Sequence, residues 1–116
     1  MSAAMEHLYD TILDHRLREV DGSRTAKLFR DGMGKMAKKL AEEAVEVALD
    51  AVQGNRDAVI RESADLLYNL SVLWVQADIR PEDVWAELRR REDMMGIAEK
   101  LPKSQPLLSE PGEPAA

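Results

Sequence analysis

The chain has 116 residues, a length that ordinarily forms one domain with a core sufficient for independent folding. It has no cysteine, which excludes disulfides, thiolate metal sites and cysteine nucleophiles, so any metal must be held by oxygen or imidazole ligands. The formal net charge of -6 argues against a nucleic-acid partner, because such proteins need a basic surface. A small phosphate ligand is compatible with that charge.

The N-terminal sequence MSAAMEHLYDTILDHR has early acids and helically spaced apolar residues, unlike the basic start and unbroken apolar run of a signal peptide. The most apolar stretch, 64–79, is interrupted by polar residues and falls short of the roughly 20 apolar residues of a membrane span. We therefore expect a soluble, cytoplasmic protein without a membrane partner.

Apolar residues at helical spacing predict an all-α fold with four main helices, arranged as a bundle. The first runs from Met5 to about Arg18. Between residues 20 and 34 the pattern weakens and glycines interrupt it, leaving a short helical piece at 25–29. This loop is the segment expected to reach a ligand.

The second main helix is predicted from Lys35 to Gln53, with Gly54 just past its end. Asn55 or Asp57 then caps a third helix that runs to about residue 77. Beyond Ser63 this third helix is apolar in almost every direction and needs covering on several sides. We expect a homodimer with this helix near the interface, although a buried central helix fits the same pattern.

The fourth helix opens at 80–83, with proline in its first turn and acids near its positive end. The composition then shifts to the proline-rich segment PKSQPLLSEPGEPAA. We expect a helical domain over 1–101 and a flexible tail over 102–116.

Acidic residues recur on the second and third helices at spacings that put them on one face of each. They are Glu42, Glu43 and Glu46 on the second helix, and Glu62 and Asp65 on the third. If the two helices pack antiparallel, these faces converge, and the mutual repulsion of the carboxylates calls for a hard cation. Oxygen ligands suit Mg²⁺ or Mn²⁺, which commonly bridge carboxylates to phosphates. Phosphate anhydride hydrolysis is the chemistry that follows.

Plainer interpretations stay open at this point. Glu-Glu on a helix is usually a solvated face. Asp65 lies in an apolar stretch and would be costly to bury unpaired, but Lys39 could pair with it. Lys35, Lys38 and Lys39 either hold substrate phosphates or form ion pairs with the acids one turn later. Lys39 shares the acidic face and is the best placed of the three to reach a phosphate.

The longer pattern KKLAEEAVEVALDAVQGNRDAVIRESADLLYNLSVLW, with PEDVWAELRRR, LYDTI and GSRTAKLFRDG, resembles the phosphoribosyl-ATP pyrophosphatase family. That family lies within the all-α nucleotide pyrophosphatases of MazG type, whose signature is Glu-Glu-x-x-Glu followed by Glu-x-x-Asp. The likeness spans about residues 8–103. It implies Mg²⁺-dependent hydrolysis of phosphoribosyl-ATP to phosphoribosyl-AMP and pyrophosphate, the second step of histidine biosynthesis, by a helical dimer.

The carboxylates and the resemblance together suggest roles for individual residues. Glu43, Glu46, Glu62 and Asp65 are the expected metal ligands, and Glu42 is expected to orient or deprotonate water. The expected substrate contacts are Ser23, Arg24, Thr25, Lys39, Asn69, Lys100 and Lys103.

The sequence departs from the family pattern at Arg24, Ala41 and Asn69, where the family usually has Tyr, Gly and often His. Two alternatives therefore stand beside the main hypothesis. One is a related pyrophosphatase acting on another, housecleaning nucleotide. The other is a non-catalytic helical interaction module whose acidic face only faces solvent.

Overall fold

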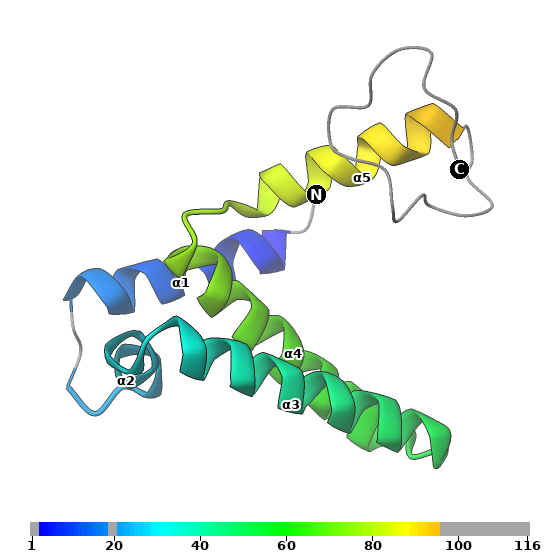
Figure 1. Cartoon of the computed structure of the whole chain (residues 1–116), viewed down its shortest axis with the longest axis horizontal. Helices are drawn as coiled ribbons and strands as arrows, with labels where there is room; N and C mark the ends of the chain where they lie inside the picture. Colours follow the sequence, from blue (N-terminus) through cyan, green and yellow to red (C-terminus); the bar gives the residue numbers. More distant parts are fainter. Residues whose placement is uncertain (1–2, 19–20, 96–116) are drawn as a thin grey trace. The chain divides into compact units, whose positions relative to one another are not determined.

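The computed structural model describes residues 3–18 and 21–95, and this part of the chain is helical without a strand. Its helices are α1 (Ala3–Arg18), α2 (Arg24–Asp31), α3 (Met33–Val52), α4 (Arg56–Gln76) and α5 (Pro81–Met95) (Figure 1). The all-α prediction is confirmed. Helices α1 to α4 belong to one compact unit, and the chain from Glu82 onward belongs to a second, so α5 is described by itself.

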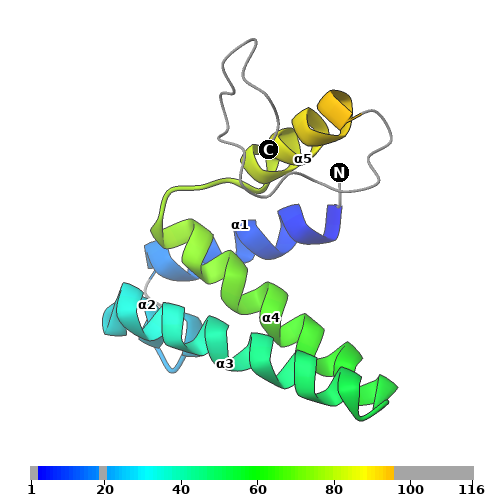
Figure 2. The same ribbon diagram turned by 45° about the vertical axis from the view of Figure 1, so that its right-hand side comes forward.

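Helices α3 and α4 form an antiparallel hairpin and lie side by side in both views (Figures 1 and 2). The turn between them needs a positive φ, which Gly54 supplies at 73°. Asn55 then caps α4, because its side chain accepts a hydrogen bond of 3.2 Å from the Ala58 amide. The predicted glycine and cap are confirmed. The hairpin brings the two acidic helices face to face.

The short helical piece predicted at 25–29 is longer than expected and forms α2, which joins the four predicted main helices to give five in the described part of the chain. Ser23 caps this helix by accepting a hydrogen bond of 3.2 Å from the Ala26 amide. Lys27 and Asp31 pair across one turn at 2.9 Å, and Gly32, with φ 91°, ends the helix. Local capping therefore forms a helix too short for apolar periodicity to reveal.

Most of the core of the α1–α4 unit lies where α1, α2 and the C-terminal half of α4 meet, and one residue near the start of α3 and one near the start of α4 are buried as well. Its buried apolar side chains are Met5, Tyr9, Ile12, Ala26, Leu28, Met36, Ala58, Val72, Trp74 and Val75. The α3–α4 hairpin is less well covered. Val45, Leu49 and Val52 of α3 and Ile60 and Leu67 of α4 are exposed, and we name them the apolar hairpin surface. Within the single chain the C-terminal half of α4 is largely buried and its N-terminal half largely exposed. The homodimer expected to cover this helix stays a prediction.

Helix α5 begins at Pro81 with Glu82 and Asp83 in its first turn, as the sequence predicts. Its main internal feature is Glu87, which accepts hydrogen bonds from both Arg90 and Arg91 at 2.7 to 2.8 Å. These bonds lower the pKa of Glu87 to about 2. The carboxylate therefore stays ionised and ties two successive arginines to the helix at any physiological pH. Among the described residues, no helix is both long enough and apolar enough to cross a membrane.

Candidate metal and phosphate site

Three carboxylates from the two helices of the hairpin converge on one point. Glu43 of α3 and Glu62 and Asp65 of α4 each offer an oxygen atom, and these atoms all lie within 4.8 Å of one another. Glu62 and Asp65 project together because they are three residues apart on a helix, and Glu43 faces them across the antiparallel contact. Glu43 and Glu62 are half-buried, whereas Asp65 is exposed. We name these three residues the carboxylate trio.

Glu43 is the trio member with the least favourable surroundings. Its Oε2 atom is buried and accepts no hydrogen bond from the described residues. Burial raises the pKa of the Glu43 carboxyl, and the charges of Glu46 and Asp65 raise it further, while a hydrogen bond with Glu62 acts in the opposite direction. A buried acceptor without a donor is costly, so this oxygen is placed for a ligand from outside the chain.

Glu46 and Glu42 lie at the edge of the trio. A hydrogen bond with Glu62 and the charge of Glu62 raise the pKa of the Glu46 carboxyl, so these two side chains are close neighbours across the hairpin. Glu46 is exposed, as is Glu42 one turn earlier on α3. The structure thus brings Glu43, Glu62 and Asp65 together, sets Glu46 beside them, and leaves Glu42 on the solvent side.

The donor set fits a hard divalent cation. All the candidate ligands are carboxylate oxygens, the atoms that Mg²⁺ and Ca²⁺ prefer. A cation would supply a partner for the buried Glu43 oxygen and offset the repulsion that raises the pKa of both Glu43 and Glu46. The trio can therefore bind a metal ion.

Asp65 was expected to be buried, which would have favoured a cation beside it, and that expectation is wrong. Asp65 lies in an apolar stretch of sequence, but its side chain is exposed. No ion pair joins it to Lys39 among the described residues, nor do Lys38 and Lys39 pair with the acids one turn later. The burial that calls for a cation is found at Glu43 instead.

A basic pocket of about 250 Å³ lies between α2 and the first turns of α3. Its lining consists of Arg24, Lys27, Leu28, Asp31, Lys35 and Lys39. Lys27 is bound to Asp31, which leaves the other three cations without a compensating acid in the lining. Lys39 precedes Glu43 by four residues, or about 6 Å along the helix axis. An anion in this pocket would therefore lie next to the carboxylate trio.

Arg24 and Lys39, both predicted substrate contacts, line this pocket; Lys27 was not predicted, and Lys35 was left open between a phosphate contact and an ion pair. Arg24, Lys27 and Asp31 share one stripe of α2, at spacings of three and four residues. These three residues share a face only if residues 24–31 form one helix, and the sequence predicted a helical piece only at 25–29.

Ser23, Thr25 and Asn69 were also predicted to contact substrate, and each is engaged within the fold. The Ser23 hydroxyl caps α2 and lies 3.0 Å from His15 Nδ1. The buried Thr25 hydroxyl lies 2.6 Å from the Tyr68 hydroxyl, and buried Asn69 donates to the Asp65 carbonyl at 2.8 Å. Their substrate contacts stay predictions. Lys100 and Lys103 lie outside the described residues.

The Thr25–Tyr68 hydrogen bond ties α2, which carries half of the basic pocket, to the helix that carries Glu62 and Asp65. Replacing Tyr68 with Phe leaves the buried Thr25 hydroxyl without this partner, so we expect the free energy of unfolding to fall by about 1–2 kcal/mol in urea denaturation. In a double-mutant cycle, adding Thr25→Val to Tyr68→Phe should then lower the free energy of unfolding only slightly further. Additive losses would show that the two hydroxyls are not coupled.

The antiparallel acidic hairpin and its adjacent basic pocket define an all-α protein in which carboxylates that could hold a metal ion lie beside a cluster of cations. The chain belongs to the phosphoribosyl-ATP pyrophosphohydrolase family, whose model matches residues 5–92. This confirms the resemblance drawn from the sequence.

Curated relatives agree with the family match. The chain is 62% identical to "Phosphoribosyl-ATP pyrophosphatase 2" of Rhodopseudomonas palustris over all of its own length and 87% of the relative. It is 65% identical to the protein of the same name from Bradyrhizobium diazoefficiens, over 90% of this chain and 78% of the relative. The phosphoribosyl-ATP pyrophosphatase of Gluconobacter oxydans is 51% identical over 83% of this chain and 72% of the relative.

Proposed function

We propose that this protein hydrolyses phosphoribosyl-ATP to phosphoribosyl-AMP and pyrophosphate, the second step of histidine biosynthesis, with Mg²⁺ as its cofactor. The observation that carries the proposal is the carboxylate trio, one helical turn from a basic pocket, with a buried Glu43 oxygen that accepts no hydrogen bond from the described residues. Family membership and the names of the relatives supply the reaction. A cytoplasmic location and the lack of a nucleic-acid partner stay predictions from the sequence.

In this proposal Glu43, Glu46, Glu62 and Asp65 hold the metal, with Mn²⁺ as a possible substitute for Mg²⁺. When bound, the cation offsets the charge of the substrate phosphates and makes phosphorus more open to attack. The half-buried position of Glu43 and Glu62 fixes these two ligands by packing. The exposed Asp65 and Glu46 leave the side of the site that faces the substrate open.

Glu42 is assigned the proton transfer. It is exposed on α3, one turn before Glu46, so it flanks the cluster without belonging to the trio. The oxygen of a water molecule forms a new bond to phosphorus, the bridging bond between the α and β phosphates breaks, and pyrophosphate leaves. Glu42 accepts the proton that the water gives up, a role that needs only hydrogen-bond reach.

Arg24, Lys35 and Lys39 balance the charge of the polyphosphate beside the metal. Their pocket lies on the α2 side of the carboxylate trio. The β and γ phosphates, which leave as pyrophosphate, can therefore lie in this pocket while the α phosphate lies at the trio. Charge-assisted contacts from such cations hold phosphate oxygens in register with the attacking water.

A panel of substrates tests the proposed function against its alternatives. We expect pyrophosphate release with Mg²⁺ to be fastest, by kcat/KM, on phosphoribosyl-ATP. A common nucleoside triphosphate that is turned over better would instead support the housecleaning alternative, for which Arg24, Ala41 and Asn69 are the departures of interest. Turnover of none of these nucleotides, without measurable Mg²⁺ or nucleotide binding in calorimetry, would support the non-catalytic interaction module.

We also propose that the protein acts as a homodimer that buries the apolar hairpin surface. Leu49 and Val52 are 56% and 88% exposed in the single chain, which is unusual for contiguous large apolar side chains. We expect Leu49→Lys to shift the protein toward monomer in sedimentation velocity. Leu17 is 70% exposed on α1, so Leu17→Lys serves as the matched control and should leave the assembly unchanged. A native protein that sediments as a monomer would refute the dimer.

A further inference from the structure

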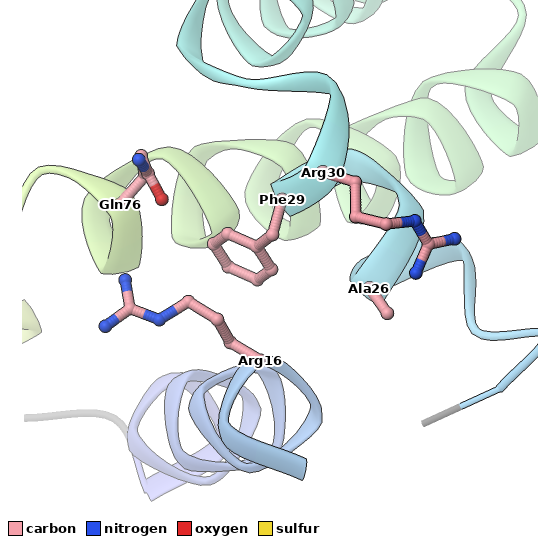
Figure 3. A pocket seen from close by; sticks show the side chains of 5 residues that line it. All are labelled: Arg16, Ala26, Phe29, Arg30 and Gln76. Atoms are coloured by element: carbon pink, nitrogen blue, oxygen red, sulfur yellow. The ribbon is translucent and has the colours of Figure 1, made fainter. Parts of the chain in front are cut away.

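A second cavity, of about 350 Å³, lies among α1, α2 and α4 and does not include the carboxylates. Its lining is Arg16 of α1, Ala26, Phe29 and Arg30 of α2, and Gln76 of α4 (Figure 3). We name it the arginine pocket. Its volume lies within the range of small-molecule sites, ~300–1,000 Å³. Its function is not explained by the metal site.

The charge of this pocket suits an anion. The described residues that line it include two guanidinium groups and no carboxylate. Arg16 is held in place, because its Nη1 donates to the Val75 carbonyl at 3.2 Å and its guanidinium lies 5.6 Å from the centre of the Phe29 ring. Arg30 is exposed, and no ion pair of the described residues includes it. The pocket thus joins a fixed guanidinium with one that is available to a ligand.

The other groups restrict the kind of anion. Figure 3 shows the Phe29 ring above the Arg16 side chain, with Gln76 to one side and Arg30 to the other. An aromatic ring and an amide suit the apolar face and the hydroxyl groups of a sugar, while guanidiniums form paired hydrogen bonds with phosphate oxygens. A sugar phosphate, which carries a phosphomonoester, combines these features.

The arginine pocket and the basic pocket lie on opposite sides of α2. Arg24, Lys27 and Asp31 follow one stripe of this helix, Ala26 and Phe29 lie on its far side, roughly 130° and 170° around, and Arg30 lies between, at about 95°. A helix with its side chains is about 10–12 Å across. An extended nucleotide with phosphate at both ends can span that width over the exposed side of α2.

We infer that the arginine pocket receives the sugar-phosphate end of the substrate, while its polyphosphate end lies at the carboxylate trio. This inference rests on the proposed function, because phosphoribosyl-ATP carries a triphosphate at one end and the phosphomonoester of its phosphoribosyl group at the other. ATP has only the first. The arginine pocket then supplies the selectivity for phosphoribosyl-ATP over ATP.

Steady-state kinetics of Arg30→Gln test the inference, with pyrophosphate release from phosphoribosyl-ATP as the readout and ribose 5-phosphate as the inhibitor. We expect the KM to rise about tenfold, as for the loss of one charge-assisted contact, with a smaller change in kcat. Ribose 5-phosphate should compete with the substrate in the native protein, and its inhibition constant should rise by a similar factor in Arg30→Gln. Ribose, which lacks the phosphate, should not inhibit.

Arg18→Gln is the matched control, because Arg18 is an exposed arginine of α1 whose ion pair with Asp14 lies outside the pocket. Arg18→Gln should leave unchanged both the KM for phosphoribosyl-ATP and the inhibition constant of ribose 5-phosphate. For Arg30→Lys, both constants should lie between those of Arg30→Gln and those of the native protein. Native constants in Arg30→Gln, or inhibition by ribose 5-phosphate that is not competitive, would overturn the inference while leaving the proposed function intact. A native protein that releases no pyrophosphate would instead refute the proposed function itself.

Discussion

Replacing Glu43 with Gln should abolish turnover, with kcat lower by on the order of a thousandfold, because several kcal/mol of charge stabilisation is lost with the cation. Glu43 is the member of the trio whose oxygen is buried without a hydrogen-bond donor among the described residues. A neutral amide keeps the shape of the side chain but binds Mg²⁺ poorly. The fold should be retained, as judged by circular dichroism, because the substitution also removes a charge that its neighbours Glu46 and Asp65 repel.

Glu42→Gln is the comparison that separates proton transfer from metal binding. It removes one carboxylate from the same helix, but from its exposed edge. We expect kcat to fall about a hundredfold while the heat of Mg²⁺ binding in calorimetry stays close to that of the native protein. If Glu42→Gln loses metal binding as fully as Glu43→Gln does, the division of roles between these two residues is wrong. A native turnover rate in Glu43→Gln would refute the proposal that the carboxylate trio binds the catalytic metal.

Binding of Mg²⁺ should stabilise the protein strongly. A ligand present at a hundred times its dissociation constant adds about 2.7 kcal/mol, which for a domain of this size raises the Tm by roughly 10 °C. Thermal denaturation with Mg²⁺ and with a chelator measures the difference. The rise should disappear in Glu43→Gln and persist in Glu42→Gln. Equal Tm values for the native protein in both conditions would contradict a metal site at the trio.

The same experiment has a pH dependence whose sign follows from the site. In the folded, metal-free protein the pKa values of Glu43 and Glu46 are raised above their ordinary value of 4.5, so the folded state binds protons more tightly than the unfolded chain. The resulting loss of stability is absent below pH 4.5 and grows as the pH rises through the raised values. With chelator, these groups should therefore make the protein less stable at pH 7.5 than at pH 5, and Glu43→Gln should weaken that trend.

Short-range signals in the sequence were sufficient for the hairpin that builds the site. Gly54 and Asn55 act through their own backbone conformation and capping bond, so their roles can be read from a few neighbouring residues. The spacing of Glu62 and Asp65 likewise fixes a shared helix face. Antiparallel packing after a short turn then brings that face to Glu43, as the sequence indicates.

Features that depend on packing between residues far apart in the sequence could not be predicted from such local signals. The exposure of Asp65 and the burial of the Glu43 oxygen are set by how α3 and α4 pack, which apolar neighbours along the chain do not determine. Thr25 and Tyr68 are 43 residues apart, so nothing local links them. The basic pocket depends on α2, whose two turns are too few for a clear apolar period.

Product analysis with phosphoribosyl-ATP tests the central claim most directly. The native protein with Mg²⁺ should release one pyrophosphate for each phosphoribosyl-AMP formed, and neither product should appear with chelator or with Glu43→Gln. Release of orthophosphate in place of pyrophosphate, or turnover that survives both removal of the metal and the loss of Glu43, would contradict a carboxylate-held cation acting at the α–β anhydride.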